Sequence, residues 1–330
     1  MNVLVANHAP NLPVLLQTLS SARLLQRTVR SKGHKLKTMT SIRWAFKCGS
    51  WTPDQSEWLL ASSSIQPEEK KRIGQFVFTK DAKSAMAGRL LARKAIHETL
   101  SIPWADIQLA RTERGKPYLV KMDSIDRAEY PSFNFNTSHH GDYAVLATEP
   151  ELPCGVDVMK VVRPNQSMED FFRNMKRQFT PYEWQTILAA DTPYQQLHRF
   201  YRHWCLKESY IKALGIGLGF DLQRAEFRLG TLELSPSSVA MDTELYLRDR
   251  LDKKWVFQET MVDEEHYVAV ALQLGPDYQR PTCPSFTILQ PEELLATATA
   301  MHPEDLAYWE DFASKQEAPH LPHRKPLERD

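Results

Sequence analysis

One acidic residue lies on the apolar face of a long predicted helix. Residues 193–214 carry apolar side chains at spacings of three, four and seven, which predicts an amphipathic helix. Glu208 falls inside this stripe, about 40° past Trp204 around the helix. A carboxylate there is costly unless a cation or strong donors meet it. A metal, a buried base or an arginine such as Arg202 therefore reaches Glu208, and Lys212, one turn further on, adds a positive charge.

A second acid interrupts a short apolar strand. The sequence GVDVMKV at 155–161 predicts a strand in which Val156 and Val158 share one face. Asp157 then lies on the other face beside Met159. An acid in such a strand is typical of a metal ligand or of a hydrogen-bond hub.

A polar turn follows another predicted strand, in FNFNTSHHGDY at 133–143. Ser138 could be a nucleophile with His139 or His140 as its base, but neighbouring strand residues face opposite sides and no G-x-S-x-G surrounds the serine. Zinc binding by the histidine pair lacks further ligands at suitable spacing. Backbone amides, a hydroxyl and imidazole donors in one turn favour a phosphate site.

Basic residues gather at two other positions. RTERGKP at 111–117 places Arg111, Arg114 and Lys116 around one glycine. The segment is either a solvated hairpin turn or a phosphate clamp, since charge-assisted hydrogen bonds to phosphate are strong. The run EEKKRIGQF at 68–76 is typical of a solvated helix face, with Arg72 as a further phosphate-binding candidate.

The order of predicted elements defines an α+β fold with two similar halves. In each half, helices precede antiparallel strands and pack on a small sheet, and the site lies in the cleft between the halves. We expect a basic, acid-free and disordered extension at 1–40, halves at 41–161 and 162–275, and a loosely packed tail at 276–330. The predicted helices cover 57–60, 67–76, 80–100, 168–178, 180–189 and 193–214. The predicted strands cover 42–46, 107–112, 117–120, 133–138, 143–149, 155–161, 224–229, 243–248, 254–260 and 266–273.

The composition limits the class of protein. In 330 residues, 41 Lys and Arg balance 41 Asp and Glu, so net charge gives no reason to expect nucleic acid or an acidic membrane as a partner. The four cysteines form no C-x-x-C pair, which is typical of a reducing compartment. No apolar run approaches the ~20 residues that cross a bilayer, so we expect a soluble protein. Residues 1–40 match a mitochondrial presequence in kind, although a disordered extension has the same composition.

Four motifs in this order resemble a known family. GKP at 115–117, SHHGDYAV at 138–145, GVDV at 155–158 and WCLKESYIKALG at 204–215 are similar to the larger, monomeric type of 4′-phosphopantetheinyl transferase, its vertebrate members included. The resemblance covers residues 41–275 well and the tail in patches. It implies two pseudo-symmetric α+β halves with coenzyme A and Mg²⁺ in the cleft, which agrees with the halves expected from the order of elements.

The resemblance also implies roles for single residues. Asp157 and Glu208 would bind Mg²⁺, and Glu208 and Lys212 would be catalytic, with Glu208 as the general base on the carrier serine and Lys212 at the leaving phosphate. Met159 stands where many family members have a second acid, and a thioether is a poor magnesium ligand; water or His140 would fill that position. The implied coenzyme A-binding residues are Arg72, Arg111, Thr112, Glu113, Arg114, Gly115, Lys116, Asn136, Thr137, Ser138, His139, Glu208, Ser209, Tyr210, Ile211 and Lys212.

The implied partners are coenzyme A and carrier domains. The carriers are the acyl carrier protein of fatty acid synthase and the carrier domain of aminoadipate-semialdehyde dehydrogenase, served by a monomer in the cytosol. Import into mitochondria is the alternative if residues 1–40 act as a presequence. Two other functions are weighed against the transferase: a non-catalytic protein that binds coenzyme A or a carrier, and a magnesium-dependent phosphohydrolase that needs no carrier.

Overall fold

The computed structural model describes residues 40–120, 133–236, 238–276 and 281–318. All of these belong to the unit Met39–Asp330, one of the two into which the chain divides. The predicted basic extension at 1–40 lies outside the described residues apart from its last position. Within the described part, no helix is both long enough and apolar enough to cross a membrane.

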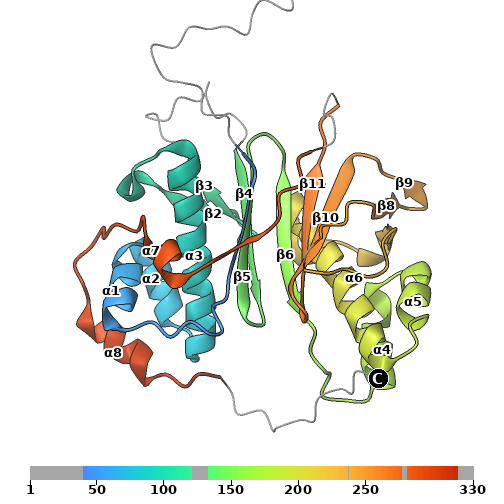
Figure 1. The fold of residues 1–330 in the computed structure, drawn as a ribbon, viewed down its shortest axis with the longest axis horizontal. Helices are drawn as coiled ribbons and strands as arrows, with labels where there is room; N and C mark the ends of the chain where they lie inside the picture. Colours follow the sequence, from blue (N-terminus) through green and yellow to red (C-terminus); the bar gives the residue numbers. More distant parts are fainter. Residues whose placement is uncertain (1–39, 121–132, 237, 277–280, 319–330) are drawn as a thin grey trace, which may run out of the picture. The chain divides into compact units, whose positions relative to one another are not determined.

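The N-terminal half packs helices on one sheet. The long helix α3 lies against the strands β4 and β5, and α1 and α2 lie on the outer side of α3 (Figure 1). The predicted helices and strands of this half are confirmed, with boundaries that shift by a few residues. The elements are β1 (Ile42–Phe46), α1 (Gln55–Ser63), α2 (Pro67–Gly74), α3 (Thr79–Leu100), β2 (Leu109–Arg111), β3 (Pro117–Leu119), β4 (Asn134–His140) and β5 (Tyr143–Glu149).

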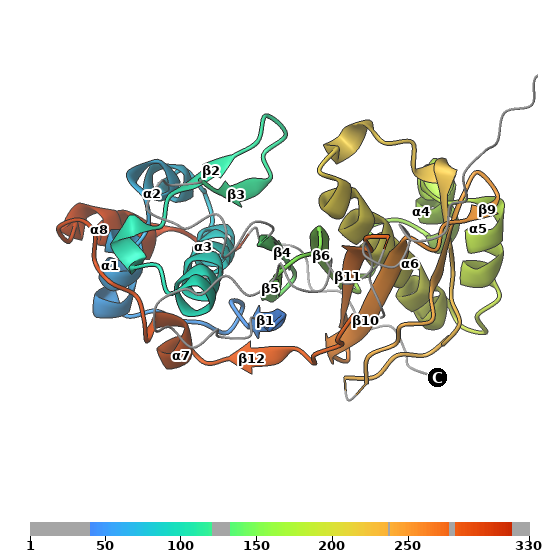
Figure 2. The same cartoon turned by 90° about the horizontal axis from the view of Figure 1, so that it is seen from above.

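The C-terminal half repeats this plan on the other side of the paired sheets. Its long helix α6 packs on β6 and β11, and α4 and α5 lie beside α6 (Figure 2). The α+β class with helices on small, mainly antiparallel sheets is confirmed. The elements are β6 (Cys154–Lys160), α4 (Met168–Met175), α5 (Pro181–Leu188), α6 (Pro193–Leu214), β7 (Ala225–Arg228), β8 (Glu244–Leu247), β9 (Arg250–Leu251), β10 (Trp255–Asp263) and β11 (His266–Gln273).

The strand β6 belongs to the C-terminal sheet and not, as the boundary at 161 implied, to the N-terminal half. It pairs with β11 in the order β10-β11-β6, with Asp157 opposite Ala269. The proline-containing segment 162–167 was predicted to separate the two halves. Strand pairing, however, depends on backbone partners that the local sequence does not reveal. The two sheets meet at β4 and β6, where the backbone N–H of Val156 donates to Oδ1 of Asn136 at 2.9 Å.

The expectation of a loosely packed tail at 276–330 is wrong for its described part. The strand β12 (Thr287–Leu289) pairs in parallel with β1, and α7 (Pro291–Leu295) and α8 (Leu306–Ser314) follow it. Leu294 and Phe312 are buried in the N-terminal core, and Phe312 stacks on Trp58 with ring centroids 3.6 Å apart. Pro291 is the first residue of α7, a position that favours proline, so this proline does not indicate a loss of packing.

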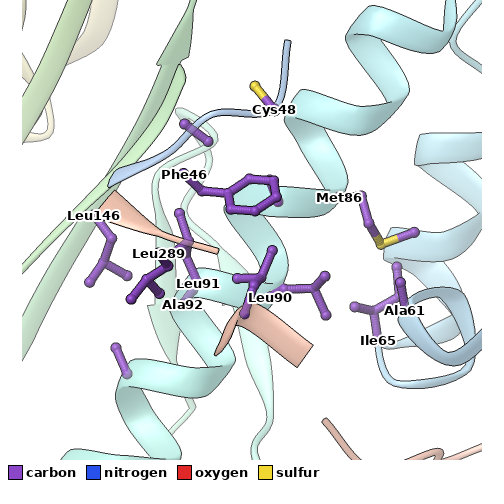
Figure 3. Close-up of a cluster of buried hydrophobic side chains, with 14 of the residues drawn as sticks. Phe46, Cys48, Ala61, Ile65, Met86, Leu90, Leu91, Ala92, Leu146 and Leu289 are labelled. Atoms are coloured by element: carbon purple, nitrogen blue, oxygen red, sulfur yellow. The ribbon is translucent and has the colours of Figure 1, made fainter. Parts of the chain in front are cut away.

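The core of the N-terminal half forms around α3. Figure 3 shows Met86 of α3 beside Ala61 and Ile65, while Leu91 lies beside Leu289 of β12. These side chains are fully or almost fully buried, so they hold α3 between the other helices and the sheet. The same helix carries Arg89 toward the site described below.

The strand β6 and the helix α6 approach each other at a glycine. A Cβ built on Gly155 would lie 2.2 Å from the backbone oxygen of Ser209 and 2.3 Å from the backbone nitrogen of Ala213. Since both neighbours are backbone atoms of a helix, neither can move aside cheaply. Only glycine therefore permits this spacing between β6 and α6.

We predict that Gly155→Ala destabilises the protein. Overpacking costs about 1–3 kcal/mol, and the contact with helix backbone places this change at the upper end or beyond. The measurement is the free energy of unfolding in urea, followed by circular dichroism. Gly88→Ala in α3 is the matched control, because its Cβ meets nothing within 4 Å and should leave stability unchanged or higher. Equal stability of Gly155→Ala and the parent protein would contradict the prediction.

Candidate active site

A buried carboxylate lies where β4, β6 and α6 meet. Asp157 of β6 is 2% exposed, and its Oδ1 accepts hydrogen bonds from Oγ of Ser138 at 2.8 Å and from Nζ of Lys212 at 2.5 Å. Nζ of Lys212 also donates to Oγ of Ser138 at 2.6 Å. Within the described part of the chain, Oδ2 of Asp157 has no hydrogen-bond partner. One oxygen is thus fixed by two donors and the other is left available to a ligand.

The second acid lies one helical turn before this lysine. Glu208 is half-buried on α6 and, with Lys212, lines a cavity of about 310 Å³. Burial raises the pKa of Glu208, the charge of Asp157 raises it further, and the ammonium of Lys212 opposes the shift. A carboxyl group held in this way is a stronger proton acceptor than one in water.

The alternative of a structural ion pair between Glu208 and Arg202 is wrong. Arg202 is 2% exposed and donates instead to both carboxylate oxygens of Glu259, at 2.8 and 3.0 Å. No ion pair of Glu208 occurs among the residues that the structure describes. An ion pair therefore does not explain why Glu208 lies inside the apolar stripe. The explanation that remains is a functional role of this carboxylate.

The two acids fit a hard cation. Asp157 offers the unpartnered buried Oδ2, and Glu208 offers a carboxylate without an ion pair. Mg²⁺ is commonly bound through one or two carboxylates, with water and substrate phosphates completing the octahedron. The described residues contain no group of three or more His, Cys, Asp or Glu placed to hold a metal, so the candidate site rests on these two carboxylates.

The position two residues after Asp157 carries no acid. Met159 is partly buried and packs against the hydrophobic core of the C-terminal half. Nδ1 of His140 accepts a hydrogen bond from the backbone N–H of Lys160 at 2.9 Å, so only its Nε2 is left for a ligand. The expectation that water or His140 fills the metal position left by Met159 stays a prediction.

The tip of the β2–β3 hairpin touches the end of α6. Nζ of Lys116 donates to the backbone oxygens of Lys212 at 2.9 Å and of Ala213 at 3.4 Å, and Arg114 donates to the backbone oxygen of Ile216. Cations favour the C-terminal end of a helix, where carbonyls lack helical partners. Burial lowers the pKa of Lys116. The predicted phosphate clamp therefore forms a wall of the cavity and also joins the two halves.

A second cavity of about 300 Å³ shares four residues with the first, so the two adjoin. The shared residues are Arg89, Arg111, Thr137 and His139. Burial lowers the pKa of His139, and the charges of Lys212 and Arg89 lower it further, so the imidazole is neutral near pH 7. Both cavities thus present donors that suit phosphate groups.

Most of the residues implied by the resemblance line these cavities. At the first cavity the structure places Arg111, Arg114, Gly115, Lys116, Asn136, Thr137, His139, Glu208, Ile211 and Lys212, and at the second Arg72. Thr112 and Glu113 are exposed on the hairpin and line neither cavity. Ser138 is buried and bonded to Asp157, so it positions the acid rather than facing a nucleotide.

Two further implied residues point away from the site. Ser209 is fully buried and donates to the backbone oxygen of Leu206, while Tyr210 packs in the C-terminal core against Trp255. The reason is helical periodicity, because residues one and two positions after Glu208 lie on other faces of α6. Their assignment as coenzyme A-binding residues therefore needs correction, at least for their side chains.

The sequence analysis missed Arg89, which lines both cavities. Arg89 lies three residues after Met86 and one before Leu90, within the apolar side of a helix that was predicted from those residues. A charged residue on the apolar side of a predicted helix indicates a functional role, and this pattern could have identified Arg89 as it identified Glu208. Pro117, Gly215 and Gly217 also line the first cavity and were not assigned.

A buried histidine from the C-terminal sheet holds the turn after β4. His266 is 1% exposed; its Nδ1 lies 2.7 Å from Oδ1 of Asp263, and its Nε2 accepts from the backbone N–H of Asp142 at 3.1 Å. The ring therefore carries its proton on Nδ1 and is neutral. Gly141 has a φ of 63° and leaves no room for a side chain against this ring. The turn that carries His139 is fixed in this way.

Comparisons with known proteins agree with this geometry. The family model of the 4′-phosphopantetheinyl transferase N-terminal domain matches residues 49–151, and that of the 4′-phosphopantetheinyl transferase superfamily matches residues 153–271. The division between the two matches falls before β6, as the sheet pairing does. The chain therefore belongs to the 4′-phosphopantetheinyl transferase family, and it is an enzyme that transfers phosphopantetheine to carrier proteins.

Individual relatives extend the comparison. The chain is 51% identical over 293 residues to the L-aminoadipate-semialdehyde dehydrogenase-phosphopantetheinyl transferase of Homo sapiens, which covers 86% of this chain and 94% of that protein. It is 40% identical to a phosphopantetheinyl transferase of Thraustochytrium over 70% of this chain and 77% of that protein. It is 30% identical to the 4′-phosphopantetheinyl transferase Sfp of Bacillus subtilis over 51% and 67%. The expected resemblance to the vertebrate enzymes is confirmed.

We predict that His266 makes stability depend on pH. Burial lowers the pKa of His266, an effect that the carboxylate of Asp263 opposes and the ammonium of Lys160 increases. The carboxylate of Asp142 and the ring of Tyr143 also face the imidazole. The pKa of His266 in the folded protein lies below its unfolded value of about 6.5. The neutral ring therefore contributes fully to the free energy of unfolding above pH ~6.5, and this contribution is lost as the pH falls below that value.

The measurement is the free energy of unfolding in urea at several pH values between about 5 and 8. The parent protein should lose stability below pH ~6.5 more steeply than the variant His266→Gln, since glutamine keeps an acceptor for the turn but does not titrate. Parallel profiles for the two proteins would show that His266 does not cause the dependence.

Proposed function

We propose that this chain transfers the 4′-phosphopantetheine group of coenzyme A to a serine of carrier proteins in a Mg²⁺-dependent reaction. The carriers we propose are the acyl carrier protein of fatty acid synthase and the carrier domain of aminoadipate-semialdehyde dehydrogenase, which would link the enzyme to fatty acid synthesis and lysine catabolism. The second carrier is supported by the name of the human relative. The observation that carries the proposal is that Glu208 and Lys212 line a cavity with further cationic side chains, while buried Asp157 binds Lys212 and its charge acts on Glu208.

The metal would be held by Asp157 and Glu208. Oδ2 of Asp157 is buried and without a partner, and Ser138 and Lys212 fix the other oxygen so that the carboxylate keeps one orientation. When bound there, Mg²⁺ would neutralise the pyrophosphate of coenzyme A and ease the departure of 3′,5′-ADP.

The chain's own residues would bind the substrate and move one proton. The carrier serine oxygen attacks the phosphorus joined to the pantetheine arm, the bond from that phosphorus to the bridging oxygen breaks, and 3′,5′-ADP leaves. Glu208 would take the serine proton, directly or through water, which its raised pKa favours. Lys212 would place its ammonium near the oxygen on which negative charge develops. The cations of the two cavities would hold the nucleotide.

We also propose that the enzyme acts as a monomer in the cytosol. Residues 1–40 are basic and contain no acid, so import into mitochondria is the alternative location. A fluorescent fusion of the full chain, compared with one that lacks residues 1–40, distinguishes them. A mitochondrial signal that disappears with residues 1–40 would overturn the cytosolic assignment.

One prediction of this proposal concerns the reaction and its metal. An apo acyl carrier protein incubated with this chain, coenzyme A and Mg²⁺ should gain the mass of one phosphopantetheine group, as measured by intact mass spectrometry. EDTA should abolish the gain, because in the proposed reaction Mg²⁺ neutralises the pyrophosphate of coenzyme A. No gain on several apo carriers would contradict the proposed function, and a gain that EDTA leaves unchanged would contradict the role of Mg²⁺.

Another prediction of this proposal concerns Glu208. Glu208→Gln should keep the fold and bind coenzyme A, yet lower the transfer rate by about 10²- to 10⁴-fold, the range expected when a general base is removed. Rates come from the mass assay at saturating coenzyme A, and binding from calorimetry. Glu310→Gln, an exposed change on α8, is the control and should transfer normally. Near-normal turnover of Glu208→Gln would remove this residue from the base role.

A further inference from the structure

A short segment after α8 lies where two helices of the N-terminal half meet. Residues 315–317 follow α8 and contact the end of α2 and the start of α3. We call these three residues the C-terminal strap. The strap lies beyond residue 271, where the second family match ends, and none of its residues is among those implied by the resemblance. The proposed reaction therefore gives the strap no role.

At the end of α2, the strap places a cation. Nζ of Lys315 donates to the backbone oxygen of Gly74, the last residue of α2, at 3.2 Å, and lies 2.7 Å from Oδ2 of Asp311 on α8. Cations are favoured at the C-terminal end of a helix, where carbonyls lack helical partners. Lys315 therefore fixes the last turn of α2, which carries Arg72.

At the start of α3, the strap supplies a cap that the helix itself lacks. Phe78, the residue before the helix, forms no capping hydrogen bond through its side chain. The backbone oxygen of Gln316 accepts from the N–H of Thr79 at 2.9 Å. That of Glu317 accepts from the N–H of Lys80 at 3.1 Å. Two of the amides that a helix leaves unpaired at its start thus find their acceptors in the strap.

The side chain of Glu317 adds a negative charge to this cap. Its Oε2 accepts from Oγ1 of Thr79 at 2.5 Å, and its Oε1 accepts from Nζ of Lys83 at 2.8 Å. The side chain of Lys83 is only 4% exposed, whereas that of Glu317 is 62% exposed. Negative charge is favoured at the start of a helix. Glu317 therefore joins the strap to α3 and also neutralises a buried cation of that helix.

The two helices that the strap joins form one wall of the second cavity. The last turn of α2 contributes Arg72 and Ile73 to this wall, and α3 contributes Ala85 and Arg89. Phe76, in the segment that connects the helices, also lines the cavity. The position of α2 relative to α3 therefore sets the shape of the cavity, and the strap bonds to both helices at their junction.

We propose that the C-terminal strap preorganises the cavity that binds the donor, with Lys315 and Glu317 as positioning residues for α2 and α3. This inference rests on the proposed function, in which the cations of the two cavities hold the nucleotide. Within the described residues, neither of them lines the two cavities or bonds to Asp157, so they act through the helices that they fix. A looser strap lowers the fraction of protein with a competent cavity, which weakens apparent donor binding by that fraction.

Steady-state kinetics test the strap in the full chain. KM for coenzyme A, KM for an apo acyl carrier protein and kcat are measured with Mg²⁺ for Lys315→Met, Glu317→Gln and the double variant. Each single change should raise KM for coenzyme A about two- to fivefold, the effect of one charge at a helix end. The double variant should raise it about 4- to 25-fold if the two effects multiply. The carrier KM and kcat at saturating coenzyme A should stay nearly unchanged.

Two further variants separate positioning from a loss of folded protein. Glu317→Asp keeps the charge at the start of α3 and should recover part of the donor affinity that Glu317→Gln loses. Glu310→Gln, an exposed change on α8, is the matched control and should leave every constant unchanged. A merely structural role would reduce the amount of active enzyme, which lowers the apparent kcat and leaves KM for coenzyme A as it is.

Hydrogen exchange gives a readout that needs no transfer. Peptides that span residues 74–82 contain the amides of Thr79 and Lys80, which the strap protects. Without donor, these peptides should exchange faster in the double variant than in the parent protein, as followed by mass spectrometry. Saturating coenzyme A should restore the protection, because the donor selects the ordered cavity.

The outcomes separate the two proposals. No transfer by the parent protein would contradict the proposed function. An unchanged KM for coenzyme A in the double variant, a fall in kcat without a rise in KM, or equal exchange at residues 74–82 would overturn the role of the strap while the transferase function stands.

Discussion

The candidate site depends on one contact, the approach of β6 to the backbone of α6 at Gly155. Without a side chain at Gly155, the strand lies against the helix at the level of Ser209 and Ala213. Two residues further along β6 comes Asp157, which is thereby brought within hydrogen-bond distance of Lys212. Because β6 also contacts β4, the same strand receives Ser138 from the other half. A wider spacing would leave Asp157 unable to meet its partners on either side.

Buried charges elsewhere in the chain show what a structural role looks like. Three ion pairs match such charges inside the protein, and each of the three is almost inaccessible to solvent. These pairs are Arg43 with Glu149, Arg202 with Glu259 and Lys207 with Glu183. At the site the balance is different. Oδ2 of Asp157 has no partner among the described residues, and burial leaves Glu208 with a raised pKa. Because most buried polar groups in a folded protein are hydrogen-bonded, these two carboxylates are the groups of the site that a ligand can match.

The sequence could predict the elements and the chemistry, but not the pairing of distant segments. Apolar periodicity located nearly all of the helices and strands between 42 and 273, and the misplaced charge of Glu208 pointed to the site. Nothing local indicates that β6 pairs with β11 or that β12 returns to β1. The burial of Ser209 and Tyr210 could have been predicted from the sequence. The helical period that indicated Glu208 also directs these two residues toward the core.

Arg89 illustrates the other limit of sequence reasoning. It lies on the apolar side of α3, so by the same logic as Glu208 it needed a partner. The partner, Glu69, belongs to a run of charges on α2 that is also typical of a solvated helix face. Only the fold shows that one carboxylate of this run turns inward to join two arginines, while Lys71 in the same run stays exposed.

The division of charge between the halves explains why two halves are needed. The three arginines of the second cavity come from the N-terminal half, whereas Asp157 and Glu208 belong to the sheet and helix of the C-terminal half. If the two sets lay in direct contact, arginines and carboxylates would form ion pairs with one another, as Arg202 of α6 and Glu259 of β10 do, and leave nothing for a ligand. The fold keeps them apart across a cavity. The contact of Lys116 with the last carbonyls of α6 joins the two walls, so that one ligand can contact cationic and acidic side chains at the same time.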